Sequence, residues 1–219
     1  MLCGERNFMK LPPLMVIVDA DAARGAGWTV ADLASAFLSG GATLLQLRAK
    51  AAPGGWLFAT ASAIVALAHE ANARVILNDR ADIARLSGAD GVHVGQDDLA
   101  PALVHLVVSE QTTVGFSTHT QEQVDAAVGQ PVSYVAVGPV FHTRTKPSED
   151  NAIGLAGVRE AARATRAAGL PLVAIGGIAL ESAPDVLAAG ADSVAVISDL
   201  LADGNPEARV RAYLERLTI

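Results

Sequence analysis

Charged and polar side chains stand directly after short β-branched runs along this chain. Gln46, Arg48 and Lys50 follow one such run, and Asn78 and Asp79 follow the next. Residues that follow parallel strands emerge at one rim of a sheet, so clusters far apart in the sequence can form one site. Arg48 and Lys50 are separated by one residue and point the same way on an extended segment. Two cations aimed at one point suit a diphosphate, and a solvated charge pair on a loop is the alternative.

Carboxylates stand at the ends of two neighbouring units of this pattern. Asp79 closes one unit, and the pair Asp97-Asp98 closes the next. Carboxylates from adjacent strand ends can share a Mg²⁺ ion, which completes its shell with water and phosphate oxygens. Each acid could instead cap the helix that follows it. Their matching positions beside two cations favour a metal ion together with a diphosphate.

Two later segments are suited to an anion. Gly176-Gly177 follows the seventh expected strand, and Ile197-Ser198-Asp199 follows the eighth. In α/β barrels the loops after these two strands often bind phosphate through backbone N–H groups. A tight turn that needs positive φ is the alternative for the glycine pair. The presence of both loops favours phosphate.

A long polar connection runs from Thr143 to Gly154. The hydroxyls of Thr143 and Thr145 can face one ligand, and Lys146 can place a point charge on a phosphate. Such a loop is often a mobile lid, and an ordinary exposed loop is the alternative, above all for Arg144.

The segment after the fifth expected strand is Ser117-Thr118-His119. Ser117 can bind a ligand, whereas Thr118 and His119 are better explained as caps of the next helix. His93 alternates with two valines and is expected to point inward. Neither a Ser–His–acid triad nor a His/Cys metal spacing is evident, which weakens hydrolase and zinc-site interpretations.

Apolar runs alternate with longer, Ala-rich amphipathic stretches from end to end. The expected strands are residues 14–18, 43–47, 74–77, 91–94, 113–115, 134–137, 172–175 and 193–196. The expected helices are residues 30–38, 56–71, 82–86, 99–107, 121–128, 155–168, 179–188 and 206–217. Eight βα units in 219 residues predict an α/β fold, a single (β/α)₈ TIM barrel with its active site at the C-terminal ends of the strands. An open doubly wound sheet is the alternative, but it usually has a glycine-rich loop after its first strand.

The totals narrow the class of protein. A hydrophobic content of 51% can fill one large core, so we expect one domain over residues 1–219, with a loose segment at 1–12. A net charge of −7 argues against nucleic acid as a partner. The single cysteine, Cys3, excludes an internal disulfide and agrees with a reducing compartment. The apolar run at 11–18 is too short to cross a bilayer, so we expect a cytoplasmic protein without membrane contact. The sequence leaves open whether the chain forms a homo-oligomer.

The ordered motifs from Gln46 to Ser198 resemble those of thiamine-phosphate synthases, also called thiamine-phosphate pyrophosphorylases. The first are Gln-Leu-Arg-x-Lys, Asn-Asp-Arg, Val-His-Val-Gly-Gln-Asp-Asp-Leu and Gly-x-Ser-Thr-His. Later come Val-Gly-Pro-Val-Phe-x-Thr-x-Thr-Lys, Ala-Ile-Gly-Gly-Ile and Gly-Ala-Asp-Ser-Val-Ala-Val-Ile-Ser. The resemblance implies a Mg²⁺-dependent transferase. Such an enzyme joins hydroxymethylpyrimidine diphosphate to the nitrogen of a thiazole phosphate and releases diphosphate.

The resemblance also implies residue roles. The pyrimidine diphosphate would be held by Gln46, Arg48, Lys50, Asn78, Ser117 and Lys146, and the thiazole phosphate by Thr143, Thr145, Gly177, Ile197 and Ser198. Asp79 and Asp98 would bind Mg²⁺, with Asp97 in support. The catalytic cations would be Arg48, Lys50 and Lys146.

Two positions depart from the family pattern. His142 replaces a usual Pro, and Val18-Asp19 replaces a common Thr-Asp. Neither change removes a charge-handling residue.

Family precedent and the absence of a nucleophile favour departure of diphosphate first, which leaves a pyrimidine methyl cation. Two rivals stay open: a thiazole tautomerase of the same fold, and a non-catalytic barrel that senses thiamine intermediates. Neither has much use for the full set of cations and acids.

Overall fold

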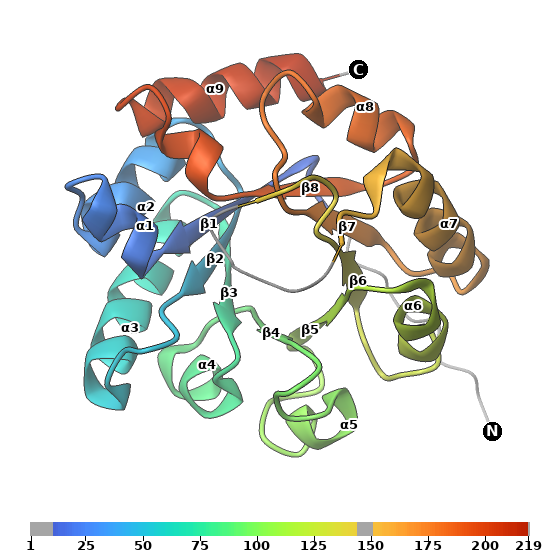
Figure 1. Cartoon of the computed structure of the whole chain (residues 1–219). Helices are drawn as coiled ribbons and strands as arrows, with labels where there is room; N and C mark the ends of the chain where they lie inside the picture. Colours follow the sequence, from blue (N-terminus) through green and yellow to red (C-terminus); the bar gives the residue numbers. More distant parts are fainter. Residues whose placement is uncertain (1–10, 144–150, 219) are drawn as a thin grey trace.

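The computed structural model describes residues 11–143 and 151–218, and within them eight parallel strands close into a barrel (Figure 1). The strands follow one another around the barrel in sequence order, and the eighth pairs with the first. They are β1 (Leu14–Asp19), β2 (Leu44–Arg48), β3 (Arg74–Asn78), β4 (Gly91–Val94), β5 (Thr113–Thr118), β6 (Tyr134–Val137), β7 (Leu172–Ile175) and β8 (Ser193–Val196). The (β/α)₈ prediction is therefore confirmed.

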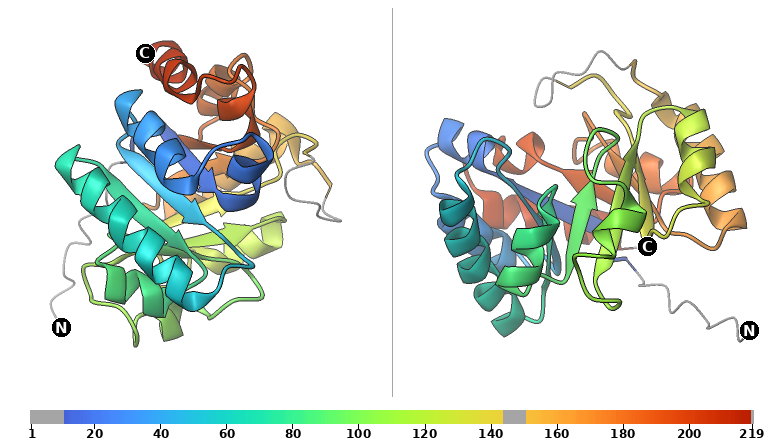
Figure 2. Two further views of the ribbon diagram at one scale, coloured as in Figure 1. Left: turned by 90° about the vertical axis from the view of Figure 1, so that its left-hand side faces the viewer. Right: turned by 90° about the horizontal axis from the view of Figure 1, so that it is seen from below.

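The helices lie outside the strands, and Figure 2 shows them along the flanks of the barrel. The first five are α1 (Ala20–Gly25), α2 (Val30–Ser39), α3 (Gly54–Glu70), α4 (Ala81–Ser87) and α5 (Pro101–Val104). The others are α6 (Gln121–Ala127), α7 (Gly154–Ala167), α8 (Ala183–Ala188), the 3₁₀ helix η1 (Ser198–Leu201) and α9 (Pro206–Leu217). Within the described residues no helix has the length and apolar character needed to span a membrane.

Strand alternation divides the apolar residues into two layers. In β1, Leu14, Val16 and Val18 belong to the large core between strands and helices. Met15 and Ile17, the residues between them, belong to a smaller core inside the barrel. Successive side chains of a strand point to opposite faces, so most strands contribute to both layers; among the described residues, β4 and β5 have none in the inner apolar core. The same alternation decides which polar side chains reach the barrel interior.

The lower interior of the barrel is filled. Tyr134 of β6 is fully buried there, and Gly115 of β5 leaves it room. A Cβ on Gly115 would lie 2.3 Å from the Tyr134 hydroxyl and 2.5 Å from Nδ1 of His93. Leu11 is also buried in this core, so it does not belong to a loose segment as predicted for 1–12. Residues 1–10 of that segment lie outside the described residues.

Several elements differ from the sequence prediction, among them α8, which begins at Ala183 and not at 179, and η1, which has no predicted counterpart. The short helix α1 was not expected; it begins because the Asp19 side chain accepts hydrogen bonds from the N–H groups of Asp21 and Ala22, at 3.1 and 2.9 Å. The helix expected at 99–107 is only Pro101–Val104. Strand β5 runs on to Thr118, three residues further than predicted.

Candidate active site

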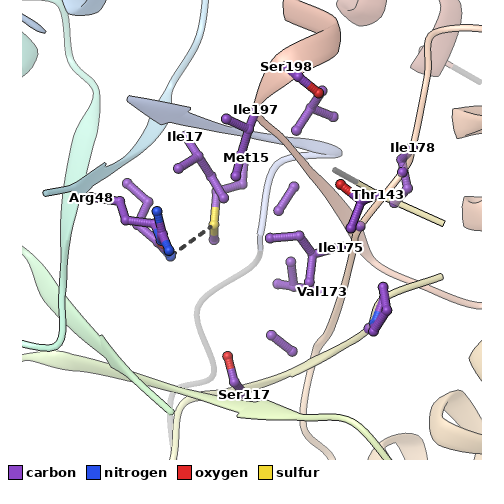
Figure 3. A pocket seen from close by; sticks show the side chains of 18 of the residues that line it. Met15, Ile17, Arg48, Ser117, Thr143, Val173, Ile175, Ile178, Ile197 and Ser198 are labelled. Atoms are coloured by element: carbon purple, nitrogen blue, oxygen red, sulfur yellow. Dashed lines mark hydrogen bonds between the residues drawn. The ribbon is translucent and has the colours of Figure 1, made fainter. Parts of the chain in front are cut away.

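A cavity of about 750 Å³ opens at the C-terminal ends of the strands. Among its lining residues are all the predicted site residues that the structure describes: Gln46, Arg48, Lys50, Asn78, Asp79, Asp98, Ser117, Thr143, Gly177, Ile197 and Ser198. In Figure 3, Arg48 enters this cavity from one side and Thr143 and Ile178 from the other. Segments up to 150 residues apart thus meet at one rim. Arg144, Thr145 and Lys146 lie outside the described residues.

Arg48 is held in place by a carboxylate of the neighbouring strand. Its Nη1 donates to Oδ2 of Asp19, and the side chains are only 16% and 4% exposed. The other oxygen of Asp19 accepts the N–H groups at the start of α1. Asp19 is therefore fixed at both oxygens, and its partner Arg48 is fixed at the wall of the cavity. A largely buried, paired Arg excludes the alternative of a solvated loop cation.

Lys50, Asp79 and Asp98 form a compact group beside it. Nζ of Lys50 lies 3.3 Å from Oδ2 of Asp79. Burial raises the pKa of Asp79, and the neighbouring Asp98 carboxyl raises it further, whereas Lys50 lowers it. Asp98 thus lies close enough to Asp79 to disfavour the charged form of Asp79. A cation between them would relieve this cost.

Neither acid caps a helix. Helix α4 begins after Arg80 and α5 after Ala100, and no side chain caps either of them. Asp98 instead accepts the N–H of Gly95 at 2.8 Å, which turns its carboxylate back toward the strand end. Asp79 has a φ of 64°, a left-handed conformation that is uncommon outside Gly, Asn and Asp. The capping alternative is therefore excluded for both residues.

A hydrogen-bonded chain of side chains crosses the floor of the cavity. His93 places Nε2 at 2.7 Å from the Ser117 hydroxyl and Nδ1 at 2.9 Å from the Tyr134 hydroxyl. Burial raises the pKa of Tyr134, and a hydrogen bond from Gln46 opposes this only in part. Gln46 also approaches the sulfur of Met15, where the dashed line of Figure 3 ends. His93 therefore points inward, as predicted, and together with Tyr134 it connects the predicted ligand-binding residues Ser117 and Gln46.

The opposite wall includes the predicted glycine pair. Gly176 and Gly177 have φ values of 101° and 64°. A Cβ on Gly177 would lie 2.6 Å from the carbonyl oxygen of His142 and 2.8 Å from that of Phe141. The glycine pair is therefore required both by its conformation and by the segment packed against it. Its backbone lines the cavity next to Ile197 and Ser198.

The predicted caps after β5 were wrong. Thr120 caps α6 by accepting the N–H of Gln123 at 3.3 Å. Thr118 instead donates to the carbonyl of Ala136 at 2.9 Å. Nδ1 of His119 lies 2.6 Å from the carbonyl of Gly138. Thr118 and His119 thus tie the end of β5 to β6 and still line the cavity.

Asp19, His93, Tyr134 and Asp199 line or support the site without having been predicted as site residues. Of these, Asp19 carried a usable signal, because an acid at the end of the first strand stands level with Arg48 in the barrel register. His93 was expected to point inward, and Asp199 was noted in the segment after the eighth strand, but the contacts that join either residue or Tyr134 to the site are made between different elements.

The fold and its cavity define an enzyme of the (β/α)₈-barrel class, with its site at the C-terminal ends of the strands. The family model described as "Thiamine monophosphate synthase" matches residues 14–200. A thiamine-phosphate synthase of Koribacter versatilis is 43% identical over 212 residues, which cover 95% of this chain and 97% of that protein. One from Roseiflexus sp. is 41% identical, covering 90% of this chain and 81% of that protein.

A solved structure agrees with these relatives. The thiamine phosphate pyrophosphorylase of Pyrococcus furiosus superposes with a TM-score of 0.83 at 28% identity, over 94% of this chain and 96% of that one. The chain belongs to the thiamine monophosphate synthase family. It is a transferase of thiamine biosynthesis that makes thiamine phosphate from small-molecule substrates, as its motifs predicted.

Proposed function

We propose that the two substrates bind at opposite sides of this cavity. The pyrimidine diphosphate lies at the ends of β2 to β5, with Gln46, Asn78 and Ser117 around its ring and Arg48 and Lys50 at its diphosphate. The thiazole phosphate lies at the ends of β7 and β8, against Thr143, Gly177, Ile197 and Ser198. One observation carries the proposal: the charged cluster and the glycine backbone line the same cavity.

Mg²⁺ fits the acid pair. Asp79 and Asp98 approach each other without capping a helix, and the pKa of Asp79 is raised by burial and by Asp98. Within the described residues no group of three or more His, Cys, Asp and Glu side chains is arranged for a metal ion. Two carboxylates suit Mg²⁺, which keeps water and phosphate oxygens as its other ligands. When bound there, the ion supplies positive charge to a leaving diphosphate.

The cations have the task of stabilising the leaving group. Arg48 is oriented by Asp19 and cannot swing into solvent without leaving a buried acid unpaired. Lys50 is half exposed and reaches the rim beside Asp79, where a diphosphate can bridge it to Arg48. Lys146, the third cation proposed for this role, lies outside the described residues. Preorganised charges of this kind are often the largest single contribution to catalysis.

The apolar part of the cavity suits a dissociative reaction. Met15, Ile17, Val173, Ile175 and Ala195 line it beneath the charged rim. Departure of diphosphate would leave a pyrimidine methyl cation over this surface, shielded from water until the thiazole nitrogen attacks. The new C–N bond replaces the broken C–O bond, and diphosphate carries away the bonding electrons. Holding both rings in place contributes several kcal/mol through proximity.

A single assay tests the assignment. The chain is mixed with both substrates and Mg²⁺, and the product is oxidised to its fluorescent form while diphosphate release is measured. We expect product and diphosphate in equal amounts, and neither without the metal or without one substrate. Thiazole isomerisation without diphosphate release would indicate a tautomerase, and binding without turnover would indicate a sensor. The predicted cytoplasmic location, the single domain and the oligomeric state stay predictions.

A further inference from the structure

One carboxylate oxygen connects three elements around the proposed thiazole phosphate site. Oδ2 of Asp199, in η1, accepts the N–H of Leu180 at 3.1 Å. The same oxygen accepts Nε and Nη2 of Arg209 at 3.1 and 2.8 Å. It also accepts the hydroxyl of Tyr213 at 2.6 Å. Charge-assisted hydrogen bonds of this kind are about twice as strong as neutral ones, so this oxygen is a strong junction.

The junction spans both loops that present backbone to the cavity. Leu180 stands three residues after Gly177, in the loop that follows β7, and Asp199 stands next to Ser198 after β8. Arg209 and Tyr213 both lie on α9. Tyr213 is fully buried in the core between strands and helices. The loops after β7 and β8 are therefore fixed to each other and to a helix that cannot move independently of the core.

The junction is protected from water. Only 18% of the Asp199 side chain and 15% of the Arg209 side chain are exposed. The Arg209 guanidinium carbon lies 6.0 Å from the centre of the Tyr213 ring, in addition to its hydrogen bonds. Burial, followed by the effect of Asp199, raises the pKa of Tyr213, so its hydroxyl keeps the proton that it donates. A second acid, Asp203, contacts Nη1 of Arg209 at 3.1 Å but is 67% exposed. The bonds from Leu180 and Tyr213 go to Asp199 and not to Asp203.

We propose that Asp199, held by Arg209 and Tyr213, is a positioning residue that sets the spacing between the two phosphate-binding loops. This inference rests on the proposed function, in which these two loops bind the thiazole phosphate. Gly177 and Ser198 offer backbone N–H groups to one phosphate, and their relative placement depends on the bond from Leu180 to Asp199. Loss of the junction lets the loops separate, which weakens binding of that substrate and leaves the pyrimidine diphosphate side untouched.

Steady-state kinetics on the full chain with each substrate varied in turn tests this assignment. Asp199→Asn keeps an acceptor for Leu180 but removes the charge that holds Arg209 and Tyr213. We expect the KM for the thiazole phosphate to rise about 30-fold, the scale of a lost hydrogen bond to a charged group. The KM for the pyrimidine diphosphate should change by less than about twofold, as should kcat at saturating thiazole phosphate.

Two milder variants keep the test interpretable if Asp199→Asn folds poorly. Tyr213→Phe removes one hydroxyl and should raise the same KM about fivefold. Arg209→Lys keeps the charge but loses the two-nitrogen contact, and should fall between the other two. Asp203→Asn is the matched control, because it removes an acid from the same Arg209 but keeps the Asp199 oxygen that accepts from Leu180 and Tyr213. It should leave both KM values unchanged.

The pattern of effects decides the outcome. A purely structural role for the junction would lower stability and reduce both substrate affinities together, and equal rises in the two KM values would overturn the proposal. An unchanged thiazole phosphate KM in both Tyr213→Phe and Asp199→Asn would also overturn it. A failure of the proposed site assignment gives a different result from a failure of this proposal. The wild-type chain would still make product, and the variants would raise the KM for the pyrimidine diphosphate instead of the KM for the thiazole phosphate.

Discussion

The two sides of the cavity recognise charge by different means. At the ends of β2, β3 and β4 the charges belong to side chains: Arg48, Lys50, Asp79 and Asp98. At the ends of β7 and β8 the cavity is lined by Gly176 and Gly177, which have only backbone, and by Ile197, Ser198 and Asp199. A diphosphate with a metal ion needs full charges to leave, whereas a phosphate that stays on its substrate needs only a fixed position. On the proposed assignment, the side that stabilises departure of diphosphate has Arg48 and Lys50, whereas the described lining of the side that holds the other phosphate includes no Arg or Lys.

The largest expected effect tests the ionic side. Lys50→Ala should reduce kcat at least about 100-fold, because a charge placed on the leaving group is lost from a preorganised site. Far-UV circular dichroism should be unchanged, since the side chain is half exposed. Diphosphate release measures the rate. Arg80→Ala is the matched control: Arg80 pairs with Asp82 at the surface near the same strand ends, outside the cavity lining, and its loss should leave kcat intact.

The acid pair gives the next effect. Asp98→Asn should raise the Mg²⁺ concentration needed for half-maximal activity about 30-fold, a scale typical of perturbed metal sites. Asp97→Asn, at the exposed neighbouring position, should change it little. An equal change in the two variants would contradict the assignment of Asp98.

The same Asp98→Asn substitution, which should weaken Mg²⁺ binding, is expected to stabilise the metal-free protein. The pKa of Asp79 is higher in the folded protein than in the unfolded chain. The free energy of unfolding therefore falls as the pH rises from the pKa of Asp79 in the unfolded chain through its pKa in the folded protein. Removing the Asp98 charge reduces this loss, so Tm of the metal-free variant at pH 7 should rise by about 2 °C. Added Mg²⁺ should stabilise the wild type and not the variant, as measured by thermal unfolding.

The backbone side is tested by Gly177→Ala. The added Cβ would meet two carbonyl oxygens at 2.6 and 2.8 Å, so the loop must shift. We expect the KM for the thiazole phosphate to rise about tenfold, with kcat less affected. Gly204→Ala is the control, because Gly204 also has positive φ (68°) but nothing within 4 Å of the new Cβ. Both variants place a Cβ on a residue with positive φ, but only Gly177→Ala should weaken binding of the thiazole phosphate.

The smallest effect concerns the orientation of Arg48. Asp19→Asn keeps an oxygen for the N–H groups at the start of α1 but weakens the pairing with Arg48. The KM for the pyrimidine diphosphate should rise about threefold, and the KM for the thiazole phosphate should not change. A larger effect on the thiazole phosphate would place Arg48 on the wrong side of the cavity.

The sequence predicted the ionic side better than the backbone side, for a physical reason. The charged residues at the strand ends can be recognised by type, and parallel-strand geometry is enough to bring them together: Arg48, Lys50, Asp79 and Asp98. Gly177 is visible as a glycine, but the carbonyls that press against it come from the segment after β6. The capping prediction for Thr118 and His119 failed because both side chains found partners on β6, which lies beyond any local pattern.

Helix boundaries show the same limit. All eight predicted helical stretches begin or end within a few residues of their observed counterparts, because apolar spacing and terminal glycines mark them. Helix α1 was missed because its single turn carries too little periodicity, and its start depends on the capping side chain of Asp19. The network of Asp199, Arg209 and Tyr213 depends on how α9 packs, which no short window of sequence encodes.

Gly115 decides what forms the floor of the cavity. Because it has no side chain, the Tyr134 ring fits inside the barrel and lines the cavity from within. A Cβ at this position would lie 2.3 Å from the Tyr134 hydroxyl. We therefore expect any larger residue at position 115 to displace this ring and reshape the surface that supports both proposed substrates.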